Sequence, residues 1–223
     1  INKPLFDRGI LAEYPPGSPF KLIGALVGLQ EGVITPRTAM TCNHGFHFGS
    51  LTVACHCKGG RLALNEAISE SCNNYFCTVY QRTIDKDGDA HAGMNRWSTH
   101  VRSFGLGTFL GNDLPTGRKG LIPDASYYDR FLGYSTWKGA TSVSNGIGQG
   151  ELVATPIQLA NMTAAIANRG YYYTPHIIRE SDHGPIDSNF TMPNYTTVDS
   201  QHFEVVINGM FDVFERGTAK GAR

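Results

Sequence analysis

The chain has 223 residues, of which 41% are hydrophobic and 17% are charged, a balance typical of globular proteins that argues against disorder. Nineteen basic residues match nineteen acidic ones, so the basic excess of a dedicated nucleic-acid binder is absent. The longest apolar run, near residues 22–29, is interrupted by Gly24 and Gly28 and is much shorter than the roughly 20 residues of a membrane span. We therefore expect a soluble globular chain that does not bind nucleic acid.

The N-terminal part of the chain predicts a loop, a helix and then an irregular segment. Residues 1–17 are rich in proline and glycine, which favours an extended loop. A helix is expected from Ser18, because Pro19 suits the first turn and Gly32 suits the end. Its apolar stripe has helical spacing and contains Phe20, Ile23, Leu26 and Val27. Residues 34–60 have no sustained period, so they predict irregular structure or a short hairpin.

The middle of the chain predicts further helices separated by loops. Helical periodicity covers residues 65–83, but the polar run at residues 69–74 makes two shorter helices an equally good interpretation. A short helix is expected over residues 95–104, where Gly105 ends it. Residues 111–150 repeat glycine, proline and serine and are predicted to be loop.

The C-terminal part predicts two helices and one strand. The clearest helix spans Thr155–Arg169, with Thr155 as N-cap and an apolar face that includes Leu159, Met162, Thr163 and Ile166. Residues 171–179 predict a strand. The last helix is expected over residues 199–216, capped by Asp199, with a buried stripe of Phe203, Val206, Met210 and Phe214. The chain is thus predicted to be mostly helix and loop, with few strands.

The sequence Ser18-Pro19-Phe20-Lys21 is the first candidate for chemistry. A serine at a helix start points its hydroxyl toward the positive end of the helix dipole, and a lysine three residues later lies on the same face. A buried lysine can lose its proton and act as a base. The alternative is that Ser18 is a simple N-cap. A second match, Ser135 to Lys138, lies in a glycine- and serine-rich loop without a helix and is not favoured.

The sequence Ser71-Cys72-Asn73 is the second candidate. Its hydroxyl and amide lie two residues apart between helical stretches and can relay a proton and hold a carbonyl. The alternative is a helix cap or kink. Serine-x-x-lysine followed by serine-x-asparagine supplies two of the three motifs of penicillin-binding proteins and serine β-lactamases, which favours the functional interpretation.

Longer motifs extend this similarity along most of the chain. The first candidate motif follows directly after Tyr14-Pro15-Pro16-Gly17. Two further pairs of motifs occur downstream: Phe104-Gly105-Leu106-Gly107 with Asn112-Asp113-Leu114-Pro115, and Gly146-Ile147-Gly148-Gln149-Gly150 with Thr155-Pro156-Ile157-Gln158. In order and spacing the chain resembles class B penicillin-binding proteins, and among them the members that act in cell elongation. The resemblance implies an α+β fold of the penicillin-binding protein and serine β-lactamase type, here a truncated, mostly helical portion without much of the sheet.

The resemblance also implies a peptidoglycan D,D-transpeptidase and the roles of its residues. Ser18 would be the nucleophile and Lys21 its base, while Ser71 would pass a proton to the departing D-alanine and Asn73 would hold the substrate backbone. The implied substrates are peptidoglycan stem peptides, and β-lactam antibiotics would acylate the same serine. No cofactor is implied for catalysis.

The implied setting is the periplasmic face of the inner membrane, with the membrane glycosyltransferase of the elongation machinery as partner of the full-length protein. The alternative functions are a D,D-carboxypeptidase or serine β-lactamase, and a non-catalytic scaffold.

The family's third motif, lysine followed by threonine or serine and then glycine, does not occur in the sequence. We therefore expect residues 1–223 to form part of a transpeptidase domain, without the strand that carries the third motif and without the family's N-terminal anchor and pedestal. The scaffold alternative rests on this absence. We expect the 223-residue chain by itself to be inactive.

Five cysteines lie between positions 42 and 77. The resemblance implies a structural zinc site with Cys42, Cys57 and Cys72 among its ligands. The histidine expected after the middle ligand is replaced by Gly59, so Cys55 or His56 would complete the set. A disulfide and free buried thiols are the alternatives, and Cys77 is predicted to belong to the core.

Overall fold

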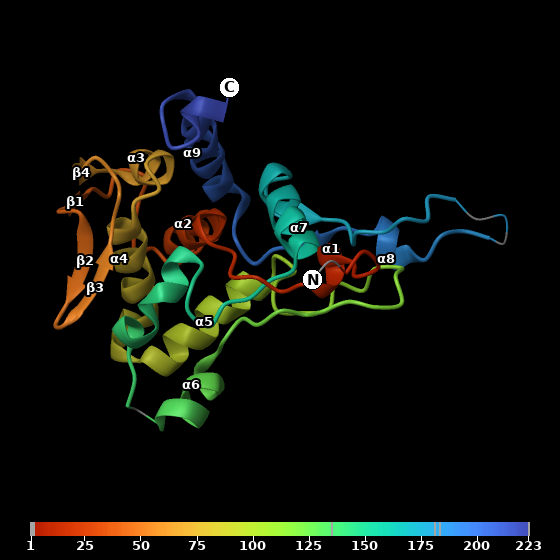
Figure 1. The fold of residues 1–223 in the computed structure, drawn as a ribbon, viewed down its shortest axis with the longest axis horizontal. Helices are drawn as coiled ribbons and strands as arrows, with labels where there is room; N and C mark the ends of the chain where they lie inside the picture. The colour runs from red at the N-terminus through yellow and green to blue at the C-terminus, as the bar shows by residue number, and fades with distance from the viewer. Residues whose placement is uncertain (1–2, 135, 181, 183, 223) are drawn as a thin grey trace.

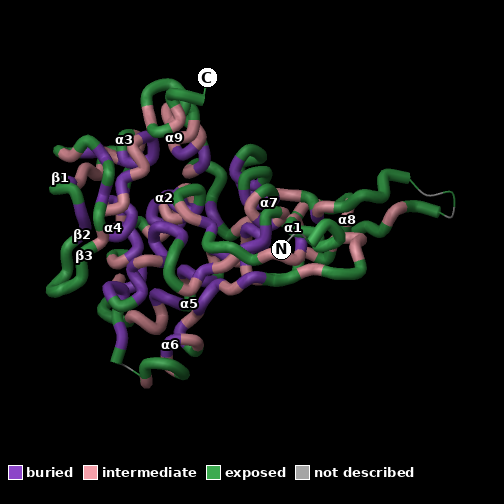
Figure 2. The backbone as a smooth tube through the Cα atoms, in the orientation of Figure 1, coloured by how far each residue is buried: buried purple, intermediate pink, exposed green. Residues whose placement is uncertain are grey.

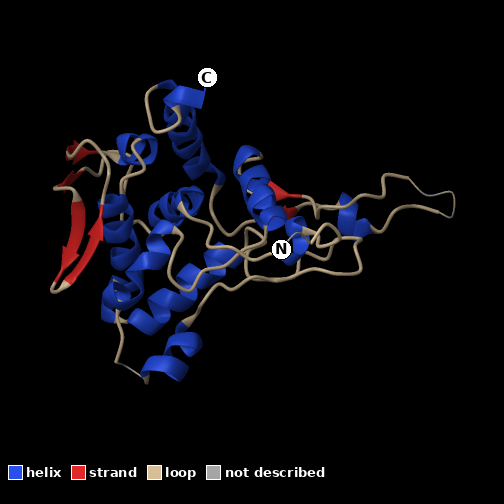
Figure 3. Cartoon of the chain, in the orientation of Figure 1, coloured by secondary structure: helices blue, strands red, loops and turns tan. Residues whose placement is uncertain are grey.

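Helices form the body of the structure, and the strands of the described residues are short, some at one edge of the body and others beside the helix at residues 156–167 (Figure 3). The computed structural model describes residues 3–134, 136–180, 182 and 184–222. The loops around α8 (Ser188–Thr191) project from the helical body as an arm (Figure 1). Within the described residues, no helix has the length and apolar character that crossing a membrane requires.

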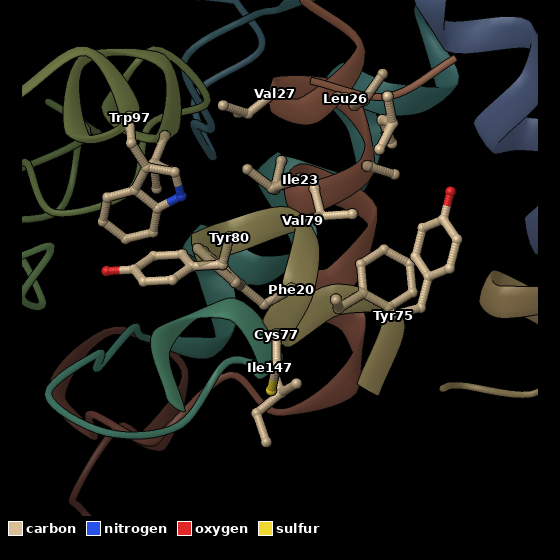
Figure 4. Close-up of a cluster of buried hydrophobic side chains, with 14 of the residues drawn as sticks. Phe20, Ile23, Leu26, Val27, Tyr75, Cys77, Val79, Tyr80, Trp97 and Ile147 are labelled. Atoms are coloured by element: carbon tan, nitrogen blue, oxygen red, sulfur yellow. The ribbon is translucent and has the colours of Figure 1, made fainter. Parts of the chain in front are cut away.

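The helix that begins at the first candidate motif lies at the centre of this body. The 3₁₀ helix η1 (Ser18–Phe20) leads directly into α2 (Lys21–Gln30), and Gly32 follows with a φ of +68°. The predicted apolar stripe is fully buried, as the prediction required (Figure 4). Phe20 lies edge-on to Trp97 of α5 (Ala90–Arg102), with ring centroids 6.1 Å apart. The packing of Phe20 against Trp97 therefore anchors the segment that begins at Ser18.

The polar run at residues 69–74 separates two helices, α3 (Leu64–Ser69) and α4 (Asn73–Ile84). The two-helix interpretation of this segment is confirmed. On α4, the apolar side chains of Tyr75, Val79 and Tyr80 are 0–3% exposed. Their burial places the break, and the second candidate motif with it, against α2.

Residues 111–150 contain two helices, so the prediction of a loop is wrong there. Asp124 caps α6 (Ala125–Leu132) by accepting a hydrogen bond from the Tyr127 N–H at 3.1 Å. The 3₁₀ segment η3 (Gly139–Ile147) packs on α4, and a Cβ at Gly146 would lie 2.6 Å from the Cβ of Tyr80. A glycine is needed at position 146 because the two backbones approach closely there.

The other helices agree in type with the prediction and differ in their bounds. The helix expected from residue 95 is α5, which begins earlier because Asp89 accepts the Ala92 N–H at 3.0 Å. α7 (Pro156–Ala167) has Thr155 as its N-cap, although Thr163 is exposed rather than buried. A short helix, α1 (Arg8–Leu11), lies within the segment expected to be loop. The turn η2 (Lys86–Gly88) connects α4 to α5.

The cysteine-rich segment forms two antiparallel pairs of strands at one edge of the body. β1 (Met40–Cys42) pairs with β4 (Gly60–Leu62), and β2 (Gly45–Phe48) pairs with β3 (Leu51–Ala54). In register, Cys42 opposes Gly60 and Gly45 opposes Ala54. The hairpin expected in residues 34–60 is therefore present, and it extends to Leu62.

The prediction of a strand over residues 171–179 is wrong beyond the first two residues. Only β5 (Tyr171–Tyr172) is paired, with β6 (Asn194–Tyr195). Farther along, the carboxylate of Asp113 accepts the backbone N–H groups of Ile177 and Ile178, each at 2.8 Å. A side chain thus satisfies donors that a neighbouring strand would otherwise have taken.

The last long helix begins later than predicted and is less buried. A 3₁₀ turn, η4 (Ser200–His202), precedes α9 (Phe203–Glu215), and η5 (Lys220–Ala222) follows it. Asp199 makes no side-chain capping bond; instead its N–H donates to Gln30 Oε1 at 2.8 Å. Phe203 and Val206 are buried, but Phe214 is 52% exposed, so the predicted stripe ends early (Figure 2).

Glu31, just after α2, joins three elements through one carboxylate. Its side chain is 10% exposed and lies 3.2–3.3 Å from Lys86 Nζ, Arg96 Nε and His100 Nε2. Burial alone would raise the pKa of Glu31, but hydrogen bonds from Lys86 and His100 and the charges of Lys86 and Arg96 outweigh burial and lower the pKa below its usual value. The ionised carboxylate therefore stabilises the folded state.

We predict that Glu31→Gln lowers the free energy of unfolding by about 1–2 kcal/mol at neutral pH. Because the folded-state pKa is lowered, this difference from wild type is fully present above the unfolded pKa and is lost as pH falls through the folded pKa. Denaturant unfolding at several pH values measures it. Glu204→Gln is the control, since the Glu204–Arg169 pair is more than half exposed and should contribute about 0.5 kcal/mol or less. Equal losses in the two variants would contradict the prediction.

Candidate active site

The turn that carries Ser18, the candidate nucleophile, is held by backbone contacts with the glycine-rich segment near residue 148. The Gly17 N–H donates to the Gly148 carbonyl at 2.7 Å, and Tyr14 exchanges two backbone hydrogen bonds of 2.9 Å with Ala154. Ser18 follows Gly17 and is exposed, while Phe20 below it is completely buried. The glycine-rich segment thus lies directly against the turn that carries Ser18. The hydroxyl of Ser18 is thus presented to solvent on a rigid base.

Lys21 is a buried lysine, only 3% exposed, in the first turn of α2. Its Nζ donates to the Ser71 carbonyl at 2.7 Å, to Ser71 Oγ at 2.8 Å and to Asn73 Oδ1 at 2.6 Å. Burial lowers the pKa of Lys21, an effect that nearby cysteine thiolates oppose. The amine is thereby shifted toward the neutral form that can accept a proton.

Ser71 connects the lysine to Ser18. Its hydroxyl donates to Ser18 Oγ at 3.0 Å, so three polar atoms follow one another from Ser18 Oγ through Ser71 Oγ to Lys21 Nζ. Ser71 has a φ of +51°, a left-handed conformation that costs a non-glycine residue about 1–2 kcal/mol. Such strain is concentrated at functional sites. The four candidate catalytic residues, Ser18, Lys21, Ser71 and Asn73, therefore meet in one place.

Asn73 is the first residue of α4, and both ends of its side-chain amide are bound. Oδ1 accepts from Lys21, and Nδ2 donates to the Ala54 carbonyl at 2.8 Å. Sequence reasoning missed Ala54, because a backbone carbonyl at a strand end leaves no signal in the residue type. A search for it would have required the register of the β2–β3 hairpin.

A cavity of about 370 Å³ opens beside the two serines. Ser18, Lys21 and Ser71 form its polar wall. Its apolar wall comes from α2, α3 and α9 and includes Leu22, Ile68, Met210, Val213 and Phe214. The sequence placed Met210 and Phe214 in the core, whereas both line this cavity. The arrangement can hold an acyl group with its carbonyl against Ser18.

The cysteines 42, 55, 57 and 72 converge beneath the site. Their sulfurs all lie within 4.8 Å of one another, with Sγ–Sγ distances of 3.0 Å for the pair 42 and 57, 3.4 Å for 55 and 57, and 3.6 Å for 55 and 72. All five cysteines of the chain are free thiols, and Cys77 is buried in the core as predicted (Figure 4).

These four thiols fit a tetrahedral zinc ion. Thiolates at about 2.3 Å from zinc place their sulfurs about 3.8 Å apart, close to the spacing here. Burial would raise the pKa of Cys55, but backbone N–H groups at Cys57 and at the start of α4, together with neighbouring thiols, lower its pKa to about 7. Burial raises the pKa of Cys42 to about 11. A thiolate is thus favoured at Cys55, whereas a metal ion would be needed to deprotonate Cys42 at neutral pH.

Cys55 completes the set, and His56 does not. His56 is exposed and is not among the described residues whose ligand atoms converge. At Gly59, where the family resemblance leads one to expect a histidine, an added Cβ would lie 3.3 Å from the His44 ring. The ring of His44 thus occupies the space that a side chain at position 59 would use.

Residues 2–223 match the family described as "Penicillin binding protein transpeptidase domain". The chain belongs to the penicillin-binding protein transpeptidase family. It is 33% identical over 238 residues to the peptidoglycan D,D-transpeptidase MrdA of Acinetobacter baumannii, an alignment that covers 100% of this chain and 33% of that protein. The chain therefore spans about a third of the length of this relative.

Solved structures of the family share the fold. The crystal structure of Pseudomonas aeruginosa PBP2 in complex with WCK 5153 has a TM-score of 0.83 and 30% identity, and the alignment covers 98% of this chain and 49% of that one. A structure described as "Structural coordination of polymerization and crosslinking by a peptidoglycan synthase complex" has a TM-score of 0.81 and 28% identity, with 99% of this chain and 36% of that chain covered. The predicted fold class is confirmed: this is the penicillin-binding protein fold, here mostly helical.

We predict that Gly148→Ala disrupts the nucleophile turn. At Gly148, with φ +71°, an added Cβ would lie 2.1 Å from the Gly17 carbonyl oxygen. The control is Gly32→Ala, because Gly32 has nearly the same φ, +68°, and nothing within 4 Å of its added Cβ. We expect the control to lose about 1–2 kcal/mol of unfolding free energy from backbone strain, and Gly148→Ala to lose about 1–3 kcal/mol more from the clash. Denaturant unfolding of both variants measures the difference, and similar losses would contradict the assigned contact.

Proposed function

We propose that this chain carries the nucleophile half of a peptidoglycan D,D-transpeptidase active site, which acts on stem peptides ending in D-Ala-D-Ala. The observation that carries the proposal is the connected series Ser18 Oγ, Ser71 Oγ and Lys21 Nζ, with steps of 3.0 and 2.8 Å. A hydroxyl nucleophile needs an adjacent base for acyl transfer, and a buried amine linked to it by hydrogen bonds can supply that base.

In the acylation step, Ser18 Oγ attacks the carbonyl carbon of the penultimate D-alanine. With Lys21 neutral, the two hydroxyls turn so that Ser18 donates to Ser71 Oγ and Ser71 donates to Lys21 Nζ. The Ser18 proton then passes to Ser71 Oγ as Ser71 gives its own proton to Lys21. The tetrahedral intermediate then collapses, and the bond from this carbonyl carbon to the nitrogen of the terminal D-alanine breaks. Ser71 gives a proton to that nitrogen and recovers one from Lys21. The products are an ester on Ser18 and free D-alanine.

In the second step, the amine of a neighbouring stem peptide attacks the ester carbonyl. The new amide bond forms, the bond to Ser18 Oγ breaks, and the proton lost by the amine returns to Ser18 through Ser71 and Lys21. Asn73 holds the substrate backbone during both steps. All proton transfers are thus assigned to side chains of this chain, and no cofactor takes part in them.

The developing negative charge on the carbonyl oxygen requires two N–H donors. We assign one to the backbone of Ser18 and the other to a strand carrying the family's third motif, outside these 223 residues, because no lysine-threonine-glycine or lysine-serine-glycine triplet occurs in the sequence. This chain is accordingly one part of the transpeptidase domain.

The full-length protein would act in cell elongation at the periplasmic face of the inner membrane. The resemblance of the motifs to elongation-type members, the similarity to the peptidoglycan D,D-transpeptidase MrdA and the likeness to a peptidoglycan synthase complex support this setting, with the membrane glycosyltransferase as partner. β-Lactam antibiotics would acylate Ser18, since their strained carbonyl presents the same electrophile as the stem peptide.

We predict that Ser18→Ala in the full-length protein abolishes labelling by a fluorescent penicillin, because the hydroxyl that would form the ester is gone. The measurement is in-gel fluorescence after a fixed incubation. The control is Ser135→Ala, which alters the second serine-x-x-lysine match; Ser135 lies outside the described residues. The control should label like wild type. Labelling that survives Ser18→Ala, or is lost only in the control, contradicts the assignment.

The same labelling separates the alternative functions. A transpeptidase forms a long-lived adduct, whereas a β-lactamase hydrolyses the reagent and loses the label with time. A D,D-carboxypeptidase also labels, but releases D-alanine from stem peptides without joining them. A scaffold remains unlabelled.

We further propose that cysteines 42, 55, 57 and 72 bind one structural zinc ion. When bound, the ion would tie the hairpins to the residue between Ser71 and Asn73, and a four-thiolate set leaves no open position for substrate or water. This support for the hairpins would come from coordination rather than from a large core.

We predict about one equivalent of zinc in protein purified without chelators. Cys42→Ala should remove most of it, because three thiolates hold zinc less tightly than four. The control is Cys77→Ala, which also removes a buried thiol but lies outside the cluster and should retain the metal. Metal analysis with intact mass decides the matter. Less than about a tenth of an equivalent in wild type, or a mass lower by two hydrogens, would favour the free thiols or a disulfide instead.

A further inference from the structure

The end of β3 contacts Asn73 at two points. The carbonyl of Ala54 accepts from Asn73 Nδ2 at 2.8 Å, and the sulfur of Cys55 accepts from the Asn73 backbone N–H at 3.1 Å. Two successive residues of one strand end therefore bind both the side chain and the backbone of a single residue in the active site.

The contact with Ala54 selects one orientation of the Asn73 amide. Its NH₂ group faces the Ala54 carbonyl, so its oxygen faces Lys21 Nζ at 2.6 Å. The reverse orientation would set the amide oxygen against the Ala54 carbonyl, so that two acceptors would face each other, and would remove the oxygen that accepts from Lys21. The strand end thus determines which group Asn73 presents to the lysine.

The contact with Cys55 satisfies the start of α4. The first N–H groups of a helix have no partner within the helix, and Cys72, the N-cap of α4, makes no side-chain capping bond. Cys55 supplies the missing acceptor for Asn73 from a different element of the structure. Its sulfur therefore caps the helix that carries Asn73 and fixes where that helix begins.

Cys55 is itself held firmly. Its N–H donates to the His44 carbonyl at 2.8 Å, and its sulfur lies 3.4 Å from that of Cys57 and 3.6 Å from that of Cys72. Cys57 is equally buried, at 4% against 5% exposure, and its sulfur contacts those of Cys42 and Cys55. The Asn73 N–H donates to the sulfur of Cys55. The two cysteines are therefore a matched pair that differs in contact with the active site.

We propose that Cys55 is a positioning residue for Asn73, through which the cysteine cluster fixes the amide that faces Lys21. The inference rests on the proposed acyl-transfer function of the site. It separates two contributions of the cluster: all four thiols hold the hairpins, and one of them also orients a residue of the reaction centre.

The test compares Cys55→Ala with Cys57→Ala in the full-length protein. Each variant removes one equally buried thiol from the cluster, so a purely structural role predicts equal effects. We expect the acylation rate constant for a fluorescent penicillin to be about tenfold lower in Cys55→Ala than in Cys57→Ala, the lower end of the range for such supporting contacts. Cys55→Ser, whose oxygen can accept the Asn73 N–H, should recover part of the difference. Equal rates in the two alanine variants overturn the proposal.

Amide hydrogen exchange gives a second measurement that does not depend on activity. The Asn73 N–H should be protected in wild type and in Cys57→Ala, and should exchange at least tenfold faster in Cys55→Ala. If Cys55→Ala does not fold, wild type alone decides, because fast exchange of Asn73 there shows that the sulfur does not hold it. A wild-type protein that fails to label with penicillin contradicts the proposed function, while the exchange of Asn73 still tests its contact with Cys55.

Discussion

The buried amine of Lys21 is the interaction on which the rest of this structure depends. An amine at 3% exposure must find acceptors, since an unpaired polar group in the interior costs about 1–3 kcal/mol or more. The acceptors lie 50 and 52 residues later, at Ser71 and Asn73. To reach them, α2 must pack against the break between α3 and α4, and this packing sets the distance between Ser18 and Ser71.

The break between α3 and α4 has a conformation that supplies these acceptors to Lys21. Three successive residues, Ser71, Cys72 and Asn73, direct their side chains to two different places: the first and third face the lysine, and the middle one enters the thiol cluster. A regular helix through these positions would not present residues 71 and 73 to one amine. The left-handed φ of Ser71 creates the bend, and the hydrogen bonds from Lys21 together with the burial of Cys72 offset its strain.

Much of the site could be predicted from the sequence, because its signals are local. Serine-x-x-lysine at a helix start places two groups on one face, and the polar run after residue 68 indicates a break in a helix. That these two segments meet came from the order and spacing of the family motifs, not from any single spacing. Convergence of the four thiols rested on the same resemblance, which named Cys42, Cys57 and Cys72 and left the fourth ligand open; geometry now favours Cys55.

What the sequence could not supply depends on packing between distant segments. In the sequence, the glycine at position 146 suggests a loop, yet the residue lies in η3. The position is glycine because α4 leaves no room there for a side chain. Tyrosines 171–173 favour a strand, but beyond β5 the backbone N–H groups of Ile177 and Ile178 donate to the side chain of Asp113 and not to a neighbouring strand. The inactivity of the 223-residue chain by itself remains a prediction.

The arrangement around Asn73 shows how the cysteine cluster would influence the proposed acyl transfer without touching substrate. Asn73 is bound on three sides: by Lys21, by the Ala54 carbonyl and by the Cys55 sulfur. Two of these three partners belong to the strand end that the thiols hold in place. If the cluster becomes less ordered, the amide oxygen that faces Lys21 also becomes less well positioned. The position of the Lys21 amine then changes as well, and in the proposed reaction this amine exchanges protons with Ser71. Sites gain precision when the groups that support them are themselves rigid, and here a few buried sulfurs supply rigidity to a hairpin with little core of its own.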